Sequence, residues 1–563
     1  MAAYIKGNIL NATHHSSTFD RAIVPKWFTY FLQIIQYFQP MKRTIFLLLC
    51  LLPVFVMAQQ QVDLIITNGR IVDGTGNSWY RGDVAVKDGK IVGVGILKNM
   101  LATRTIDAHN QIVAPGFIDV HTHIEGDEIK NPTADNFIYD GVTTVITGNC
   151  GSSQTDIKKY FSFIDSLKTS INVATLIGHN DVREAVMGTA NRQPTQDEQL
   201  KMEALVASAM KDGAVGMSTG LIYIPGTYAK TSEIVGLAKQ VALYKGVYSS
   251  HMRSESDSVI PAINEALEIG RQAGIPVEIS HFKLAGQQNW GRSKETLAAI
   301  VNSRKEGIDV TIDQYPYTAS STSLSTMIPD NILADGKDSI MARLQRPEVK
   351  QYVINDMLRS LAKRKLKHFN YAVVANFDAD TSLNGKSIEQ INLIKKKKHK
   401  AKAEAETVIE MMLQGGAGMV FHGMSDEDVN RIMQYPFSMF ASDASIRVFN
   451  LGVPHPRGYG TNARVLAKYV REQKLIPLEE AIRRMTSLPA HKFQLQNRGL
   501  IMDGLAADLV IFDENTVQDQ STFEAPHQYS TGFSYVIVNG KLVVDQGKHN
   551  GVRSGQVLYG PGY

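Results

Sequence analysis

The feature that most constrains the fold of this chain is an apolar segment that ends in two histidines, His121 and His123. Side chains alternate between faces along a β-strand, so the two imidazoles share one face and Thr122 lies on the other. The preceding Phe117 and Ile118 are typical of a strand buried in a parallel sheet or barrel. Two imidazoles on one face can bind one cation, although a His-x-His pair by itself is also compatible with ordinary buried histidines.

Apolar strands alternate with helical segments through the middle of the chain, which is the pattern of a parallel α/β architecture. Eight strands can be counted, and eight is the number of a TIM barrel. They are predicted at residues 117–123, 142–148, 172–179, 214–219, 246–251, 275–281, 308–315 and 437–443.

The two ends of the chain carry similar short strands separated by turn residues, as in a small β-sandwich. The first set lies within residues 62–113. The second includes residues 507–512 and a hairpin over 534–544 with Asn539-Gly540 at its turn. We therefore expect the two ends to form one domain.

The seventh and eighth predicted strands are separated by about 120 residues, far more than an ordinary connection. Residues 350–366, 371–377 and 404–413 predict a helix, a strand and a helix in this interval. An inserted subdomain is the simplest interpretation, and its lysine run at 395–398 is typical of a solvated surface. The predicted fold is thus an α/β (β/α)8 TIM barrel with a small β-sandwich domain built from both chain ends and an inserted subdomain between strands 7 and 8.

Residues 41–58 are similar to a secretory signal peptide, with a basic start at Met41-Lys42-Arg43 and an apolar run over 44–56. That run of about 13 residues is shorter than the roughly 20 needed to span a bilayer. We expect a mature chain that is periplasmic or secreted, with an uncleaved N-terminal anchor as the alternative. The predicted parts are 1–58 (dispensable extension plus signal peptide), 59–114 (first part of the sandwich), 115–330 (barrel), 331–420 (insertion), 421–498 (barrel completion) and 499–563 (second part of the sandwich).

The charge and cysteine content restrict the possible functions. The formal net charge is +4, and removal of residues 1–58 takes away five basic side chains and one acidic one, which brings it to zero. No basic surface that would suit nucleic acid remains. Of the two cysteines, Cys50 lies in the predicted signal peptide, so Cys150 has no internal disulfide partner. It is a buried apolar residue, a metal ligand or a nucleophile.

Six side chains that can bind metal stand at the carboxyl ends of the predicted strands, where barrel enzymes place their chemistry. Imidazole and thiolate suit zinc, and catalytic zinc sites use three protein ligands and keep one position for water. One such set is Cys150, His251 and His281. The remaining three could hold a second ion, with Cys150 between the two positions. The six residues are His121, His123, Cys150, His251, His281 and Asp443.

At these residues the chain resembles the amidohydrolase superfamily, and within it the N-acyl-D-amino-acid deacylase (D-aminoacylase) branch. The most discriminating segment is Asn149-Cys150-Gly151, because many other amidohydrolases use a carboxylated lysine at the end of strand four, where this chain has Ser218-Thr219. The resemblance covers nearly all of residues 62–563. The other matching segments are 115–123, 141–151, 220–226, 250–255, 279–283, 313–317, 442–444 and 455–457.

The resemblance implies a zinc-dependent hydrolase that cleaves the amide bond of N-acyl-D-amino acids, giving a carboxylate and a free D-amino acid. It implies one tightly bound zinc on Cys150, His251 and His281, and possible weaker binding of a second ion near His121, His123 and Asp443. Asp443 would act as general base and then as general acid. The D configuration rests on the resemblance alone. The residues similar to the family's substrate contacts are Tyr223, Lys283, Tyr315, Ser321 and Arg457.

Several alternatives remain open at this stage. The same scaffold suits a D- or iso-dipeptidase, an N-acyl-D-glutamate or N-acyl-D-aspartate deacylase, or a cyclic amidase, and basic residues in the pocket would favour the acidic substrates. From a different class, a non-catalytic zinc-bound envelope protein would fit a chain that lacked Asp443. The chain has Asn462-Ala463 where the family leads us to expect Phe-Pro, so the preferred side chain is open. We expect a small-molecule substrate, no nucleic acid and no membrane contact after signal cleavage; the oligomeric state is open.

Overall fold

The structure is a computed structural model that describes residue 30 and residues 60–563. The predicted signal peptide and Cys50 lie outside the described residues. The chain divides into a first unit, residues 1–60 with 99–101, and a second unit, residues 61–98 with 102–563, and the second contains the fold discussed below. Within the described part, no helix is both long enough and apolar enough to cross a membrane.

Eight parallel strand positions close into a barrel, which confirms the predicted TIM-barrel fold. One sheet has the order β6-β7-β8 and the other β17-β13-β12-β11-β10-β9. The third strand position is divided at Leu176 into β8 and β9, which joins the two sheets, because β8 pairs with β7 and β9 pairs with β10. The strands are β6 (Phe117–Asp119), β7 (Val142–Thr147), β8 (Asn172–Thr175), β9 (Ile177–Gly178), β10 (Gly216–Gly220), β11 (Val247–His251), β12 (Val277–Ile279), β13 (Val310–Gln314) and β17 (Ser438–Phe440).

The first and last strands meet beyond their regular ends. The Asp443 amide donates to the His121 carbonyl at 2.9 Å, and the His123 amide donates to the Ala444 carbonyl at 2.9 Å. Strand β6 is therefore shorter than the predicted 117–123. After Asp119 the pairing continues through these bonds, an isolated bridge between Thr122 and Ala444, and the Thr122 amide, which donates to the Ile146 carbonyl of β7. The third strand also ends earlier than predicted, because His179 begins a helix.

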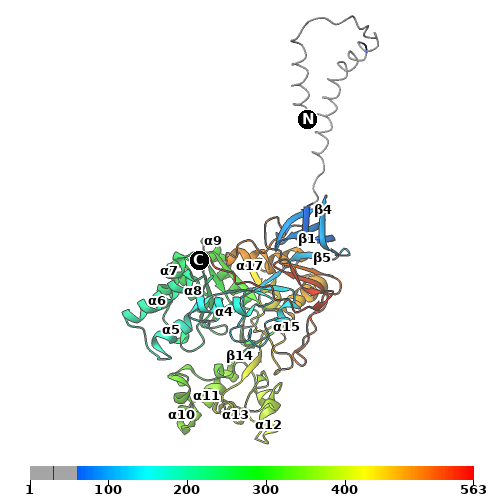
Figure 1. Cartoon of the computed structure of the whole chain (residues 1–563). Coiled ribbons are helices and arrows are strands. Elements are labelled where there is room, and N and C mark those ends of the chain that lie inside the picture. The colour runs from blue at the N-terminus through cyan, green and yellow to red at the C-terminus, as the bar shows by residue number, and fades with distance from the viewer. Residues whose placement is uncertain (1–29, 31–59) are drawn as a thin grey trace, which may run out of the picture. The chain divides into compact units, whose positions relative to one another are not determined.

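Helices surround the barrel and pack their buried faces on it (Figure 1). Helix α6 begins at the predicted capping box, in which Thr195 and Glu198 bond each other's backbone amides. The helices are α3 (Asp135–Ile138), α4 (Ile157–Leu167), α5 (His179–Met187), α6 (Gln196–Lys211), α7 (Thr231–Leu243), α8 (Val259–Ala273), α9 (Ser293–Lys305), α14 (Asp426–Met433), α15 (Arg457–Arg464), the π-helical η7 (Val465–Glu472), α16 (Leu478–Met485) and α17 (Ser487–Lys492), with short 3-10 turns at Gly226–Tyr228 and Gln287–Asn289.

The two chain ends form one nine-stranded sheet, joined where β5 pairs antiparallel with β18. One face packs into a separate core that includes Ile66, Val84 and Leu509, while Val510 and Phe512 on the other face join the barrel core. This alternation is expected of a sheet buried on both faces. The strands are β1 (Gln60–Ile71), β2 (Tyr80–Lys87), β3 (Lys90–Gly95), β4 (Met100–Asp107), β5 (Ile112–Pro115), β18 (Leu509–Phe512), β19 (Phe533–Val538), β20 (Lys541–Asp545) and β21 (Lys548–His549).

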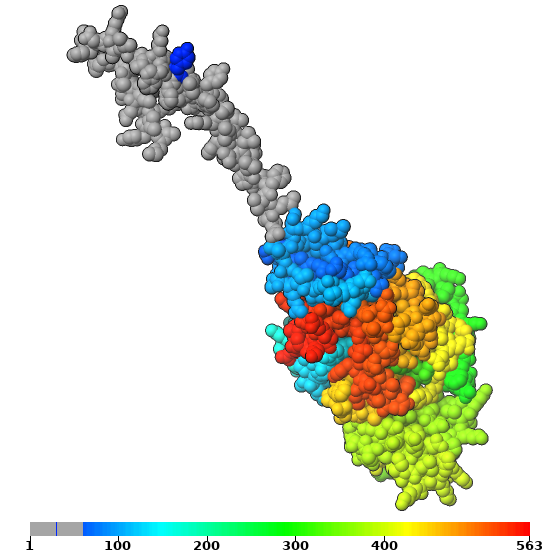
Figure 2. Space-filling view, turned by 90° about the vertical axis from the view of Figure 1, so that its right-hand side faces the viewer, coloured from blue at the N-terminus to red at the C-terminus, as the bar shows by residue number. Residues whose placement is uncertain are grey.

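The insertion between β13 and β17 has its own antiparallel sheet, β14-β16-β15, and its own hydrophobic core. It forms a distinct lobe, yellow-green in Figure 2, with α10 to α13 grouped together in Figure 1. Its first strand precedes the predicted start at residue 331. The elements are β14 (Ala319–Ser323), α10 (Gly336–Gln345), α11 (Pro347–Lys363), β15 (Ala372–Asn376), α12 (Ile388–Ile394), α13 (Ala401–Leu413) and β16 (Gly418–His422), with 3-10 turns at Leu324–Met327, Asp330–Ile332 and Thr381–Leu383.

Lys492 is one of the buried lysines, and its environment leads to a pH-dependent prediction. Lys492 on α17 is 2% exposed, donates to the Asp309 carbonyl at 2.9 Å and lies 3.3 Å from the Asp309 carboxylate. Burial lowers its pKa to about 8, although Asp309 opposes the shift. In the unfolded chain the pKa is about 10.4. Between pH 8 and about 10.4 the folded state therefore binds fewer protons, and the free energy of unfolding gains up to about 3 kcal/mol as the pH rises.

We expect the melting temperature of the wild-type protein to rise relative to that of Lys492→Met between pH 7 and pH 10. The variant carries no titrating amine at this position, so it lacks this contribution. Thermal melts followed by circular dichroism measure the difference, with the exposed Lys211→Met as the matched control. Parallel pH profiles for the wild type and Lys492→Met would show that the amine titrates as it does in water.

Candidate metal centre

Three predicted ligands converge at the mouth of the barrel, at the carboxyl ends of their strands. The Cys150 sulfur lies 3.3 Å from His251 Nδ1 and 3.5 Å from His281 Nε2, and these two nitrogens are 2.8 Å apart. The His121 Nε2 atom is 3.2 Å from the same sulfur. One thiol and three imidazoles thus face a common point, and all four residues are buried.

A second group shares this edge. His121, His123 and Asp443 place their ligand atoms within 4.8 Å of one another. The Asp443 Oδ1 atom lies 3.4 Å from His123 Nε2 and 3.8 Å from His121 Nε2. The structure therefore brings all six predicted metal ligands together, with His121 and Cys150 between the two groups.

Three of these ligands adopt a left-handed backbone conformation that non-glycine residues seldom use. The φ angles are 52° at Cys150, 37° at His281 and 50° at Asp443. Each such residue costs of order 1–2 kcal/mol, and strain of this kind concentrates at functional sites. The chain turns sharply at each position as it leaves its strand.

Two carboxylates, the partly buried Glu255 and the buried Asp313, hold the imidazoles in place, and sequence reasoning assigned them no role. Glu255 Oε1 lies 2.8 Å from His281 Nδ1 and also bonds the Lys283 ammonium. Asp313 accepts the His281 amide at 2.8 Å and lies 3.4 Å from His121 Nδ1. Both belong to the segments quoted for the family resemblance, but the contacts cross between strands, so no local pattern marks them.

Burial sets the protonation of the ligands. It lowers the pKa of His251 well below the usual value, and the neighbouring His281 lowers it further. It also lowers the pKa of His281 well below the usual value, and there the Lys283 ammonium acts in the same direction. Burial also lowers the pKa of His121 to about 4, against the opposing charge of Asp443. These imidazoles are therefore neutral, with lone pairs available. Burial raises the pKa of the Cys150 thiol well above its usual range, so a thiolate there requires a compensating cation.

Asp443 differs from the other buried groups because it has a cationic partner. Burial raises its pKa, but the Arg457 guanidinium, with Nη1 2.8 Å from Asp443 Oδ2, outweighs this effect together with His123, and the net pKa is well below the usual value. Asp443 is consequently an anion beside the cluster, able to accept a proton.

The residues fit a zinc ion. Neutral imidazoles and a cysteine sulfur are the ligands that zinc prefers, and the Cys150, His251 and His281 atoms lie within 3.5 Å of one another. Glu255 bonds the Nδ1 atom of His281, and a carboxylate in this position usually accompanies a metal-binding histidine. Zinc bound there would be held by these three residues, with the His121, His123 and Asp443 group beside it.

The predicted substrate residues lie around the same centre. The Arg457 guanidinium stacks over the Tyr315 ring at 4.6 Å and donates to the Ser321 carbonyl at 3.3 Å. The Tyr315 hydroxyl and Arg457 Nε are buried without a hydrogen-bond partner among the described residues. Two unsatisfied donors on neighbouring side chains form a site for a carboxylate. The Ser321 hydroxyl instead donates to the Met419 carbonyl at 2.8 Å.

The other two predicted contacts, Tyr223 and Lys283, lie beside the candidate ligands His251 and His281. Tyr223 stacks edge-on against His251 at 4.9 Å between ring centroids, and its hydroxyl lies 2.9 Å from the Thr322 hydroxyl. Lys283 is buried and bonds Glu255 and His281. Lys283 therefore acts on the metal ligands through these contacts as well as facing the site.

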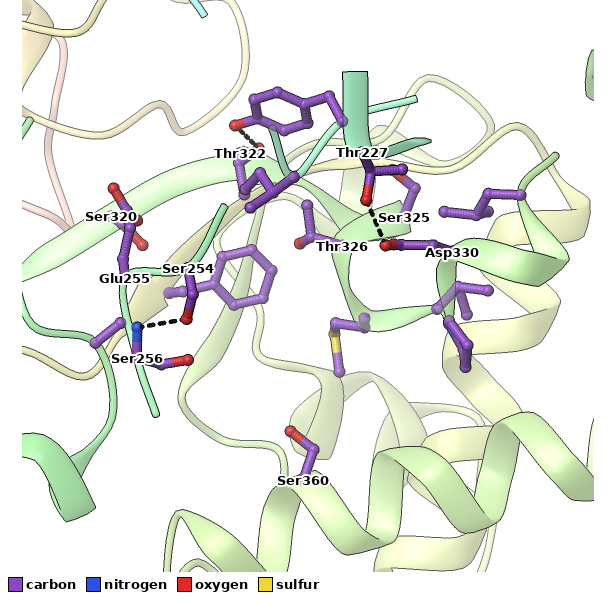
Figure 3. Close-up of a pocket in the computed structure, with 18 of the residues that line it drawn as sticks. Thr227, Ser254, Glu255, Ser256, Ser320, Thr322, Ser325, Thr326, Asp330 and Ser360 are labelled. Carbon is purple, nitrogen blue, oxygen red and sulfur yellow. Dashed lines mark hydrogen bonds between the residues drawn. The ribbon is translucent and has the colours of Figure 1, made fainter. Parts of the chain in front are cut away.

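A cavity of about 990 Å³ lies between barrel loops and the insertion, and it is lined by Tyr223 and Glu255, which contact His251 and His281. Tyr223 and Glu255 line it on the barrel side, and Figure 3 shows Thr322, Ser325 and Thr326 on the β14 side, with Thr227 bonded to Asp330. Its walls also include apolar side chains from the insertion. These are Met327, Ile328, Leu333, Ile340, Met357, Phe369, Tyr371, Met412 and Phe421.

His179, His455 and Asn462 have structural roles. His179 bonds Glu233 at 2.9 Å and does not belong to the cavity lining. His455 accepts the Arg457 amide at 3.0 Å and lies 2.9 Å from the Ala319 carbonyl, so it positions Arg457. Asn462 bonds the buried Asp140 carboxylate through its amide and side chain, outside the cavity lining.

Comparison with known proteins gives a consistent result. Residues 104–544 match the family model described as "Amidohydrolase family". An N-acyl-D-glutamate deacylase of Alcaligenes xylosoxydans xylosoxydans is 35% identical, over 87% of this chain and 95% of the relative. A D-aminoacylase of the same organism is 33% identical, over 89% of this chain and 98% of the relative.

A solved structure agrees with these relatives. It is an N-acyl-D-glutamate deacylase from Bordetella bronchiseptica, complexed with zinc and a phosphonate inhibitor that mimics the tetrahedral intermediate. This chain superposes on it with a TM-score of 0.76 at 35% identity, covering 89% of this chain and 100% of that one.

The support that Glu255 gives to His281 can be tested by measuring the affinity of the protein for zinc. Glu255→Gln removes the charge next to His281 Nδ1, and losing such a partner typically weakens metal binding by about 10- to 100-fold. Competition with a zinc chelator on the purified protein measures the change, and the exposed Glu268→Gln is the control. An unaltered zinc affinity in Glu255→Gln would exclude this role.

Proposed function

Because this chain belongs to the amidohydrolase family, in the branch of the N-acyl-D-amino-acid deacylases, we propose that it hydrolyses the amide bond of N-acyl-D-amino acids to a carboxylate and a free D-amino acid. The observation that carries the proposal is the convergence of Cys150, His251 and His281 beside an anionic Asp443. A binding protein has no need for a carboxylate at that position. The preference for the D configuration is supported by the names of the relatives.

We infer that the protein uses zinc, with one tightly bound ion on Cys150, His251 and His281. The solved relative is complexed with zinc, and the donor set here suits that metal. The second group, which consists of His121, His123 and Asp443, binds its ion more weakly in this proposal, because the His123 side chain is 34% exposed to solvent. When bound, zinc supplies Lewis-acid activation of a water molecule and of the amide carbonyl.

The chain's own residues then perform the proton transfers. Asp443 Oδ1 takes a proton from the attacking water and later delivers it to the leaving amine nitrogen. Arg457 holds Asp443 ionised in the resting site through its contact with Oδ2. The unsatisfied donors of Arg457 and Tyr315 bind the substrate carboxylate and orient the scissile bond. No covalent bond to the enzyme is needed.

The general-base role gives a direct test. In Asp443→Ala we expect kcat for N-acetyl-D-methionine to fall by about 10²- to 10⁴-fold, the usual contribution of a positioned acid-base group. Zinc bound to Cys150, His251 and His281 should remain, because none of these ligands is changed. Turnover and zinc content are measured on the same samples, with the exposed Asp503→Ala as control. Normal turnover in Asp443→Ala would contradict the assignment.

An acidic substrate side chain is the second candidate, and one cavity residue favours it. Arg253 is engaged with Glu265, but Arg364 at the end of α11 has no carboxylate within ion-pair distance in the described part of the chain. Its guanidinium lies over the Tyr371 ring at 4.9 Å. A cation that lines the cavity without a partner suits the distal carboxylate of an N-acyl-D-glutamate or N-acyl-D-aspartate.

Arg364→Met separates the two candidates. If the preferred substrate is acidic, KM for N-acetyl-D-glutamate should rise about 10-fold or more, because a charge-assisted bond is worth about 1.5–3 kcal/mol. KM for N-acetyl-D-methionine should change little. Steady-state kinetics on both substrates measure this, and equal effects on the two would leave the apolar amino acids as the preferred class.

We also propose export from the cytoplasm, on the basis of the signal-like pattern over residues 41–58. Cell fractionation with sequencing of the mature N-terminus tests this proposal. We expect the mature chain to begin near Gln59, and recovery of the unprocessed chain in the cytosol would contradict export.

A further inference from the structure

Outside the barrel, the inserted subdomain contains a second group of metal-binding side chains. His368 lies in the loop before β15, Glu389 in the first turn of α12, His399 in the loop after α12 and Glu404 in the first turn of α13. Figure 1 shows α12 and α13 in the lobe formed by the insertion. Neither the fold prediction nor the proposed hydrolysis uses these residues.

Their side chains form a compact cluster in which all four ligand atoms lie within 4.8 Å of one another. His368 Nδ1 is 2.6 Å from Glu404 Oε1 and 3.7 Å from Glu389 Oε1. His399 Nε2 is 2.6 Å from the same Glu389 oxygen. The two imidazole rings stack, with centroids 4.2 Å apart and an angle of 22° between their planes. The nitrogens of both histidines therefore point towards the carboxylates.

The buried negative charge of Glu404 makes this cluster different from ordinary hydrogen-bonded pairs of histidine and glutamate. The Glu404 side chain is fully buried, and no lysine or arginine pairs with it among the described residues. The nearby Lys395 and Lys397 pair with Glu410 instead. A buried carboxylate without a cationic partner is costly, and coordination to a metal ion is one of the ways in which proteins compensate such a charge.

We propose that His368, Glu389, His399 and Glu404 bind a divalent transition-metal ion of the zinc type, separate from the barrel centre. Two neutral imidazoles and two carboxylates are ligands that zinc accepts, and their charge of −2 balances that of the ion. Zinc sits about 2.0–2.2 Å from such ligands, which sets neighbouring ligand atoms about 3.3 Å apart in a tetrahedral site. The 2.6 Å contacts open by less than about 1 Å to admit it.

The site is linked to the cavity by the backbone. Glu404 uses its other oxygen, Oε2, to accept the Phe369 amide at 2.8 Å. Phe369 and Tyr371, one and three residues after His368 along the chain, line the cavity between the barrel and the insertion. An ion on the cluster fixes α12, α13 and this loop to one another, and so holds the apolar wall of the cavity. The ion is structural in this proposal and takes no part in the hydrolysis.

Zinc content tests the proposal without reference to activity. Full-length wild-type protein and His368→Ala/His399→Ala are equilibrated with the same buffered Zn²⁺ solution, and bound zinc per chain is measured by mass spectrometry. The same pair is prepared with Cys150→Ser, which disables the barrel centre. His491→Ala, an exposed histidine on α17, is the matched control.

We expect the double variant to bind one zinc fewer per chain than the wild type, in both the native and the Cys150→Ser backgrounds, while His491→Ala binds the same amount as the wild type. Equal zinc contents with and without the two histidines would overturn the proposal, and the histidine–glutamate contacts would then be hydrogen bonds only. Because the Cys150→Ser comparison does not depend on the barrel centre, failure of the proposed hydrolysis would not affect this outcome.

A conservative variant covers the case in which the double variant does not fold. Glu389→Gln keeps the shape of the side chain and its hydrogen bond to His399 but removes one charge. Zn²⁺ should raise the melting temperature of Cys150→Ser, since a ligand that binds only the folded state stabilises it. This increase should shrink in Cys150→Ser/Glu389→Gln, and an equal increase in both proteins would contradict the site.

Discussion

The structure depends most on the contact that closes the barrel, between the end of β17 and the segment after β6. Two backbone hydrogen bonds, from the Asp443 amide to the His121 carbonyl and from the His123 amide to the Ala444 carbonyl, replace a regular strand pairing. The same bonds place the Asp443 carboxylate beside both imidazoles. Closure of the fold and assembly of the site are thus one event, and a barrel left open between these strands would have neither.

A layer of buried acids beneath the ligands makes this edge rigid. Asp119 accepts the amides of His121 and Ser442, and so ties the first and last strands together from below. Burial raises its pKa to about 6 against these hydrogen bonds. Glu278, bonded to the Ser249 and Ser280 hydroxyls, lies one layer deeper. These bonds hold the strand ends that carry the candidate ligands, although Glu278 Oε1 has no hydrogen-bond partner among the described residues.

Much of the fold was accessible from the sequence because its signals are local. Apolar runs followed by His, Cys or Asp located the barrel strands and the six candidate ligands, and the capping box at Thr195 located the start of α6. The first strand of the insertion was missed because Ala319–Ser323 is small and polar and lacks the alternation of a strand. The interval assigned to one strand at 172–179 is divided at Leu176 into β8 and β9, and it ends at Gly178 because His179 begins a helix and pairs with Glu233.

The supporting residues could not be predicted from sequence because their partners lie on other strands or helices. Glu255 reaches His281 from the loop after the neighbouring strand, and Glu404 reaches His368 across 36 residues of the insertion. Nothing in the local sequence distinguishes such a glutamate from one on the surface. Only the folded chain shows which acids are buried against imidazoles.

Restoration of activity by zinc tests the central claim, that Cys150, His251 and His281 hold the metal on which hydrolysis depends. Zinc-depleted protein and its Cys150→Ser variant are titrated with Zn²⁺ while the cleavage of N-acetyl-D-methionine and N-acetyl-L-methionine is followed. We expect that only the D form is cleaved, that activity returns with zinc, and that Cys150→Ser does not recover it. Full activity without zinc, or equal recovery in Cys150→Ser, would contradict the account.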